Sequence, residues 1–294
     1  MKVVIAAAGL GNMMFNYGLV VAYRHLGIKS ILFVSEANAH HNGYELERVF
    51  PNVDPYRDVS WLGKYYYKFL GELRKVKVTR KKQFPHHLLF FPFKRVYTPE
   101  AFIYYPDLLG LPEVNQYVLG AFQCYQYYEH CRPELLEAYR FDENKLSAQS
   151  KQMAERIRRS QSVSIHVRRG DYMTPYFYDN LGSVCNEEYY KRAIEEIKKH
   201  VDSPSFFIFS DDKAYVKEHF DLPDATFVDF NSGTDSWQDM FLMSVCHHNI
   251  VANSSFSWWG AWLNQHADKV VIAPKRWWAS YEKDDVVPPT WTRL

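Results

Sequence analysis

The fold is decided between residues 162 and 210, where the chain reads SVSIHVR (162–168), NEEYYKRAIEEIKKH (186–200) and SFFIFS (205–210). The first and third segments have the apolar, β-branched and aromatic composition of buried strands, and the second has the apolar spacing of an amphipathic helix. The alternation continues to the end of the chain, with helices at 211–220, 236–248 and 255–267 and strands at 225–230, 249–254 and 269–274. Five strands alternating with helices predict a doubly wound, parallel α/β sheet.

The N-terminal half begins with the same pattern. KVVIAAA (2–8) predicts a strand that enters a tight turn at Gly9 and Gly11. A helix at 12–26 and a strand at 29–35 follow, which predicts a second parallel sheet. The turn lies at the carboxyl end of its strand, where open α/β sheets bind ligands. GLGNMM lacks the third glycine of the dinucleotide fingerprint. The turn therefore either lets another ligand approach the backbone closely or only connects the strand to the helix.

The length and the polar middle of the chain predict two domains. A chain of 294 residues exceeds the usual size of one domain. The segment FDENKLSAQSKQMAERIRRSQS (141–162) is polar and favours helix, and it separates the two α/β patterns. We therefore predict an N-terminal domain over 1–155 and a C-terminal domain over 156–294.

Composition excludes several classes of protein. The net charge of +1 argues against a nucleic-acid binder, because such domains carry a strong basic excess. No segment has the roughly 18 consecutive apolar residues of a membrane-spanning helix. The four cysteines lack the spacing of a zinc site or a disulfide framework, which favours a reducing compartment. We expect a cytoplasmic protein, either free or peripheral at the inner face of the cytoplasmic membrane.

One segment, 61–95, departs from this neutral balance. It holds ten Lys or Arg residues and a single acid, Glu72, with many aromatic residues between them. One interpretation is a solvated helical face. The other is a surface that contacts an anionic membrane or a lipid-linked substrate, since basic residues near such a surface are attracted to it.

Two adjacent arginines follow the strand at 162–168. Period-two alternation places His166 and Arg168 on one face of that strand, with Arg169 turning away at its end. Guanidinium groups match phosphate oxygens, so a nucleotide diphosphate is the natural ligand, and salt bridges between domains are the alternative. Asp171 then either orients a guanidinium or acts as a base.

Short polar side chains follow two further predicted strands. Asp211 and Asp212 end the strand at 205–210, where they are helix caps, acceptors for the amino and imino groups of a guanine, or magnesium ligands. The metal interpretation lacks a third carboxylate nearby. Asn253, Ser254 and Ser255 open the helix at 255–267, where they either bind an anion or cap the helix.

Four motifs together carry a resemblance to a known family. GLGNMMFNYG (9–18), HVRRGDY (166–172), FSDD (209–212) and NSSFSWWGAWL (253–263) resemble, in order and spacing, those of the bacterial α-1,2-fucosyltransferases of glycosyltransferase family eleven. The arginine motif is shared with α-1,6-fucosyltransferases, so the last motif gives the resemblance its specificity. Met13 departs from the family pattern, which often has glutamine there.

The resemblance implies a GT-B fold of two Rossmann-like domains with a donor and acceptor cleft between them. The C-terminal domain would bind GDP-fucose and the N-terminal domain the acceptor. The implied reaction is an inverting transfer of L-fucose from GDP-β-L-fucose to the 2-hydroxyl of a β-galactoside, free or lipid-linked, in a cell-surface glycan. It implies no cofactor and no metal.

The resemblance also implies roles for individual residues. Arg168 and Asp171 would be catalytic, with Arg168 and Arg169 holding the diphosphate and Asp171 as the candidate base. The remaining donor-binding residues would be Gly11, Asn12, His166, Asp212, Asn253, Ser254, Ser255 and Phe256. A fucosyltransferase that forms another linkage, a non-catalytic sugar- or nucleotide-binding module and a membrane-bound assembly factor are the alternatives.

Overall fold

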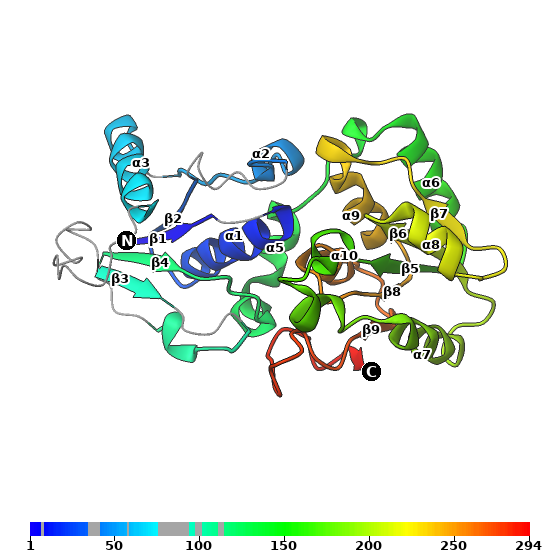
Figure 1. Cartoon of the computed structure of the whole chain (residues 1–294). Coiled ribbons are helices and arrows are strands. Elements are labelled where there is room, and N and C mark those ends of the chain that lie inside the picture. Colours follow the sequence, from blue (N-terminus) through cyan, green and yellow to red (C-terminus); the bar gives the residue numbers. More distant parts are fainter. Residues whose placement is uncertain (7–8, 35–41, 58, 76–93, 98–101, 111–114) are drawn as a thin grey trace. The chain divides into compact units, whose positions relative to one another are not determined.

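The structure is a computed structural model of the chain. It describes residues 1–294 apart from 7–8, 35–41, 58, 76–93, 98–101 and 111–114. Contacts divide the chain into two compact units, Met1–Phe141 and Asp142–Leu294 (Figure 1). Each unit holds its own parallel sheet, and we describe the two separately.

The division lies earlier than the predicted boundary between 155 and 156. That position falls inside helix α6 (Ala148–Arg158), which the contacts assign to the second unit. α6 packs on α9 (Trp237–Ser244), and the backbone N–H of Ser147 donates a hydrogen bond to Gln238 Oε1 at 2.9 Å. The helix that we expected to join the domains is therefore part of the second one.

The described part of the first unit contains a four-stranded parallel sheet in the order β2-β1-β4-β3. Its strands are β1 (Lys2–Ile5), β2 (Ser30–Phe33), β3 (Lys94–Tyr97) and β4 (Gln116–Leu119). Its helices are α1 (Leu10–His25), α2 (Leu46–Val49), α3 (Trp61–Lys75) and α5 (Arg132–Ala138). The predicted strand, helix and parallel strand are confirmed, with β1 ending at Ile5 and α1 beginning at Leu10, so that Gly11 lies inside the helix and not in a turn before it.

The second unit contains a six-stranded parallel sheet in the order β10-β9-β8-β5-β6-β7. Its strands are β5 (Ser162–Val167), β6 (Ser205–Ser210), β7 (Thr226–Val228), β8 (His248–Ile250), β9 (Val271–Ala273) and β10 (Thr292–Arg293). Besides α6 and α9, its helices are α7 (Glu187–Lys198), α8 (Lys213–His219) and α10 (Ser255–Leu263). All five predicted strands are confirmed. The sixth, β10, was not predicted because two residues show no periodicity.

Short helical turns connect these elements. Turns of 3-10 helix lie at Pro106–Leu108, Tyr125–Tyr127, Glu129–Cys131, Glu143–Lys145, Gly170–Met173 and Gly233–Asp235. A π-helical turn lies at Tyr178–Gly182. None of the helices in the described ranges is long and apolar enough to span a bilayer. All four cysteines are free thiols.

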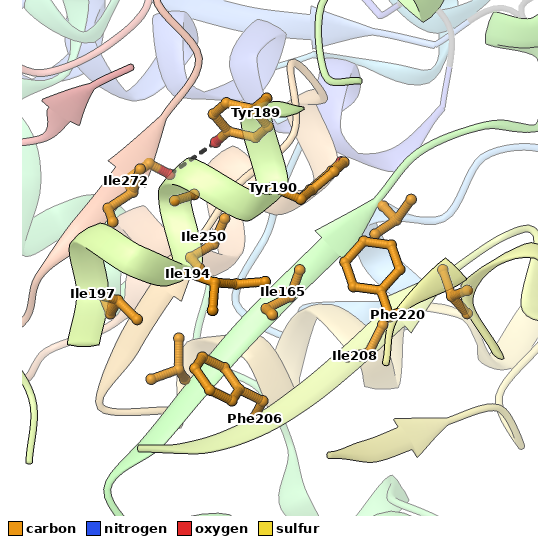
Figure 2. Packing of buried hydrophobic residues seen from close by; sticks show 14 of the residues in the cluster. Ile165, Tyr189, Tyr190, Ile194, Ile197, Phe206, Ile208, Phe220, Ile250 and Ile272 are labelled. Carbon is orange, nitrogen blue, oxygen red and sulfur yellow. Dashed lines mark hydrogen bonds between the residues drawn. The ribbon is translucent and has the colours of Figure 1, made fainter. Parts of the chain in front are cut away.

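One core cluster of the second unit packs α7 against the sheet. Ile165, Ile208 and Ile250, from three neighbouring strands, face the apolar side of α7 (Figure 2). Tyr189 on α7 also donates a hydrogen bond from its hydroxyl to the Val251 carbonyl at 2.6 Å. This packing fixes the central strands relative to one another, and so fixes where their carboxyl ends lie.

The alternation of β5 assigns its residues to two faces as predicted. Val163, Ile165 and Val167 lie in the α7 core. On the opposite face Ser164 Oγ accepts a hydrogen bond from Asn249 at 2.7 Å, and the His166 ring lies 5.9 Å from that of Phe256 on α10. β5 therefore directs His166 toward the start of α10.

Candidate active site

The carboxyl ends of β5, β6 and β8 form the candidate site. β5 pairs with β6 on one side and with β8 on the other, so the segments that follow these three strands are neighbours. They contain the arginine motif, the paired aspartates and the start of α10. Open parallel sheets bind ligands at this edge. The sheet thus brings together the motifs that the sequence analysis selected in the second half of the chain.

Arg168 lies between two carboxylates. Its Nη1 is 2.9 Å from Asp211 Oδ2, and its Nη2 donates a hydrogen bond to Asp171 Oδ1 at 2.6 Å. Its guanidinium carbon lies 5.5 Å from the centre of the Tyr172 ring. Burial disfavours the charge of Arg168, but the charges of Asp211 and Asp171 outweigh this and raise its pKa. The group is held as a fixed cation.

Arg169 is held by a different set of contacts. Its Nε donates a hydrogen bond to Asp212 Oδ2 at 3.1 Å, and its guanidinium carbon lies 3.5 Å from the centre of the Tyr215 ring. Its backbone N–H donates to Asp211 Oδ1 at 2.8 Å. Within the described part of the chain, neither Nη group of Arg169 has a hydrogen-bond partner. These donors are available to a ligand.

The aspartates explain how two adjacent arginines coexist at one strand end. Asp171, Asp211 and Asp212 place three formal negative charges against the two guanidinium groups. Both arginines are therefore held by ion pairs inside one unit. The alternative of salt bridges between domains is wrong for these pairs, since all five residues lie in Asp142–Leu294.

Asp212 also caps a helix, as one of the three interpretations predicted. Its Oδ1 accepts a hydrogen bond from the Tyr215 N–H at 3.1 Å at the start of α8. That hydrogen bond, together with the one from Arg169, outweighs burial and lowers the pKa of Asp212. No group of three or more potential metal ligands occurs among the described residues.

Gly170 lets the loop after β5 approach Asp211 closely. A Cβ atom at position 170 would lie 2.5 Å from Asp211 Oδ2, the oxygen that pairs with Arg168. Any larger residue would push this oxygen away. Glycine at position 170 therefore leaves room for the ion pair between Arg168 and Asp211.

His166 has a buried ring with an unpartnered polar atom. The residue is 6% exposed, and among the described residues no group forms a hydrogen bond with its Nδ1. Burial, aided by the charge of Arg168, lowers the pKa of His166 to about 3. The ring is therefore neutral at physiological pH and is unsuited to donate a proton as a general acid. A buried polar atom without a partner is costly, and a ligand at this point would satisfy it.

The residues that precede α10 have mainly structural contacts. Asn253 donates hydrogen bonds from its amide to the carbonyls of Leu181 at 3.1 Å and Trp277 at 3.2 Å. Its own carbonyl accepts a hydrogen bond from the Tyr172 hydroxyl at 3.1 Å. Asn253 therefore fixes the loop that carries the arginines.

The start of α10 supplies the remaining second-unit residues. Ser254 Oγ caps the helix by accepting a hydrogen bond from the Phe256 N–H at 3.3 Å. Ser255 and Phe256, in the first turn, are partly exposed. The capping interpretation is confirmed for Ser254, and the first turn stays open to a ligand.

Gly11 and Asn12 lie in the other unit, in the first turn of α1. Asn12 Oδ1 accepts a hydrogen bond from Gln123 Nε2 at 2.6 Å, and Gly11 is buried. Both residues follow β1 as expected, but they lie inside the helix and not in a turn that precedes it. The role of these two residues toward a donor stays a prediction.

Two kinds of residue in the second unit were missed from sequence. Tyr215 stacks on Arg169, yet its sequence context does not distinguish it among 22 tyrosines, whereas Tyr172, beside Arg168, lies inside the quoted motif HVRRGDY but was given no role. Asp239 on α9 accepts a hydrogen bond from Asn231 at 2.7 Å, and burial raises its pKa to about 7. Burial of this kind leaves no local sequence pattern.

Comparison with known proteins identifies the family. The family described as Glycosyl transferase family 11 matches residues 100–294, which include the whole second unit. The chain belongs to glycosyl transferase family 11. The resemblance to this family, which the four motifs indicated, is confirmed.

The family relatives include two bacterial enzymes that match over the full length. An alpha-1,2-colitosyltransferase of Escherichia coli is 29% identical over 100% of this chain and 99% of its own. The O-antigen biosynthesis glycosyltransferase WbnK of Escherichia coli is 30% identical over 98% of each chain. Galactoside alpha-(1,2)-fucosyltransferase 2 of Mus musculus is 30% identical over 51% of this chain, which spans 45% of that protein.

Solved structures with the same fold include the NodZ alpha-1,6-fucosyltransferase. NodZ co-crystallized with GDP gives a TM-score of 0.51 at 13% identity, covering 88% of this chain and 90% of NodZ. The crystal soaked with GDP-fucose gives the same TM-score at 14% identity, covering 89% and 91%. The glycosyl transferase family 11 chain thus has the predicted α/β fold of the GT-B class.

Proposed function

We propose that the protein transfers L-fucose from GDP-β-L-fucose to the 2-hydroxyl of a β-galactoside. The observation that carries this proposal is the pair of fixed arginines at the carboxyl ends of β5, β6 and β8 in a glycosyltransferase of family 11. Non-catalytic sugar binding has no need of two immobilised guanidinium groups. A departing nucleoside diphosphate does need them.

The chemistry follows from where charge develops. As the bond between fucose C1 and the phosphate oxygen breaks, negative charge grows on the diphosphate of GDP, and fixed cations stabilise it. The acceptor oxygen forms the new bond to C1 from the opposite face, so the β-linked donor gives an α-linked product. The acceptor hydroxyl loses its proton to solvent water as GDP leaves with the electron pair of the broken C1–O bond.

We assign Arg168 and Arg169 to the diphosphate. Arg169 would offer its two Nη groups, and Arg168 would present the donors that Asp171 and Asp211 leave unused. Asp171 accepts a 2.6 Å hydrogen bond from Arg168, so we propose that it positions this guanidinium and does not act as the base. Early departure of GDP makes a strong base unnecessary.

Neutral His166, with Phe256 beside it, would contact the nucleoside. Ser255 and the first turn of α10 would approach the phosphates, because a helix N-terminus attracts anions. The N-terminal unit would serve the acceptor, and its Gly11 and Asn12 would contact the donor. No metal is required in this scheme, because the arginines supply the positive charge.

The test is a transfer assay with defined donors and acceptors. Purified protein is incubated with GDP-fucose and a panel of β-galactosides, in the presence or absence of EDTA, and the linkage of each product is assigned by NMR. We expect α-1,2-fucosylated product at an unchanged rate in EDTA. Another linkage would contradict transfer to the 2-hydroxyl, and absence of turnover would contradict fucosyl transfer itself. A rate restored only by magnesium or manganese would contradict metal-independent catalysis.

A second donor is favoured by the first of the bacterial relatives. Its name records transfer of colitose in place of fucose. The same assay with GDP-colitose in place of GDP-fucose decides between them. A higher kcat/KM for GDP-colitose would transfer the assignment to that sugar and leave the roles of the arginines unchanged.

A further inference from the structure

Helix α3 carries an exposed apolar face. The side chains of Trp61, Leu62, Tyr65 and Phe69 are 68%, 61%, 67% and 58% exposed. Positions 61, 65 and 69 lie on successive turns of one helix face, with 62 beside them. Single exposed apolar residues need no explanation, whereas a contiguous group of them marks an interaction site.

The face belongs to a helix that is anchored in the first unit. Tyr66 packs against the core of that unit's sheet, together with Tyr56. Lys64 Nζ lies 5.0 Å from the centre of the Tyr56 ring, and the rings of Trp61 and Tyr65 meet edge to face at 5.9 Å and 89°. The apolar residues are therefore presented on a packed element, with Tyr66 directed to the core and Trp61 and Tyr65 to solvent.

Lysines border this face. Lys64 and Lys68 are exposed and lie one turn apart, matching the spacing of Trp61, Tyr65 and Phe69. The predicted basic segment 61–95 carries ten basic residues and one acid, although 76–93 lie outside the described part of the chain. Trp and Tyr prefer the interface between lipid headgroups and acyl chains, and lysines are attracted to anionic headgroups.

We propose that α3 docks the protein on an anionic lipid bilayer. Trp61, Tyr65 and Phe69 enter the boundary between headgroups and acyl chains, and Lys64 and Lys68 contact the lipid phosphates. The charges of Lys64 and Lys68 select a bilayer with anionic lipids over a neutral one. This inference is independent of the proposed sugar transfer, because the surface needs neither donor nor acceptor.

Flotation of the full chain with vesicles tests the docking. Vesicles of phosphatidylcholine are compared with vesicles that also contain phosphatidylglycerol, and neither contains a glycan. We expect binding to the anionic vesicles that weakens as salt is raised. Lys64→Gln and Lys68→Gln should each weaken it roughly fivefold, and the triple change of Trp61, Tyr65 and Phe69 to Ser about 100-fold.

Two leucines provide a matched control. Leu62→Ser removes an apolar side chain from the proposed face, and Leu26→Ser removes one that is 47% exposed at the end of α1. Only Leu62→Ser should weaken vesicle binding. Circular dichroism melting checks that each variant is folded, which we expect because these side chains are exposed.

The depth of Trp61 gives a second readout. Brominated acyl chains quench tryptophan fluorescence on contact, and Trp61→Phe keeps an aromatic residue while removing that fluorophore. We expect anionic vesicles with brominated lipid to quench the unsubstituted protein, and this quenching to be lost in Trp61→Phe although the variant still binds.

Three results would overturn the proposal. The first is equal vesicle binding by the triple serine variant and by Leu26→Ser. The second is quenching that survives in Trp61→Phe. The third is sedimentation of the lipid-free protein as a dimer that the triple serine change dissociates, since this would assign the face to a second copy of the chain.

Discussion

At the scale of single residues, the site depends on how each guanidinium is oriented. Arg168 is shared by Asp171 and Asp211, and Arg169 is clamped between Asp212 and the Tyr215 ring. These contacts fix the cations before a ligand arrives, so little reorganisation is needed when charge develops on a leaving diphosphate.

Lysine substitution should separate the two arginines. Arg168→Lys keeps a charge but loses the planar fork that reaches two carboxylates, so we expect kcat to fall on the order of 100-fold or more, roughly 2.7 kcal/mol. Arg169→Lys should cost less, because only one carboxylate holds its side chain. Kinetics at saturating GDP-fucose measure both. A larger loss in Arg169→Lys, with both variants folded, would reverse their roles.

The stacking residue Tyr215 should affect donor binding. Tyr215→Leu removes the ring that lies 3.5 Å from the Arg169 guanidinium carbon, and we expect GDP to bind about 3- to 30-fold more weakly, in line with cation–π energies. Tyr215→Phe keeps the ring and loses only an exposed hydroxyl contact with Glu187. It is the matched control. Calorimetric titration with GDP should therefore separate the two variants, and equal affinities would remove Tyr215 from the site.

Asp239 should make stability depend on pH. Its folded pKa is raised from 3.8 to about 7, so the folded state binds a proton more tightly than the unfolded state between these values. Stability then falls as pH rises through this range, by up to about 1.4 kcal/mol per pH unit. Asp239→Asn should abolish this slope and be more stable than the parent above pH 7.

Urea unfolding measured at several pH values tests this linkage. The control variant is Asp235→Asn, because Asp235 is exposed and lies just before α9, the helix that carries Asp239. An unchanged slope in Asp239→Asn would mean that its carboxyl is not the titrating group.

At the scale of elements, the turn after β5 is the most constrained part of the site. β5 ends at Val167, and the two arginines and the turn Gly170–Met173 follow, held by Asp211 at the end of the neighbouring β6 and by Asn253, which follows β8. Three segments far apart in sequence therefore position one pair of side chains.

Gly170→Ala should disable this turn with little effect on the fold. The added Cβ would displace Asp211 Oδ2 from Arg168, so we expect transfer activity to fall at least about tenfold, in line with loss of an oriented charged contact. The melting temperature should change little, because Gly170 is exposed. Gly110→Ala, whose new Cβ would meet no atom closer than 3.9 Å, is the control. Full activity in Gly170→Ala would show that the ion pair is dispensable.

At the scale of the whole molecule, the candidate residues are distributed over two units. The second unit contains the arginines, aspartates and α10, whereas the first contains Gly11, Asn12 and the exposed face of α3. If GDP binds where we propose, hydrogen exchange should slow on adding GDP at 166–172, 210–215 and 252–257. The surface of α6 should be unaffected. Protection confined to other segments would place the nucleotide elsewhere.

The sequence by itself determined the α/β class, the order of the elements and the family. Strand and helix periodicities are local properties, and motifs at strand ends have to meet because parallel strands share one edge. The two faces of β5, with Val163, Ile165 and Val167 in the apolar cluster and Ser164 and His166 on the other side, also followed from alternation alone.

Only the tertiary structure decided which partner each charged residue has. Asp211 and Asp212 follow β6, and strand pairing alone brings them to Arg168 and Arg169 after β5. The position of the domain boundary and the buried state of Asp239 likewise depend on packing between distant segments. Such contacts join residues of large sequence separation, and no local pattern encodes burial or the exposed face of a helix like α3.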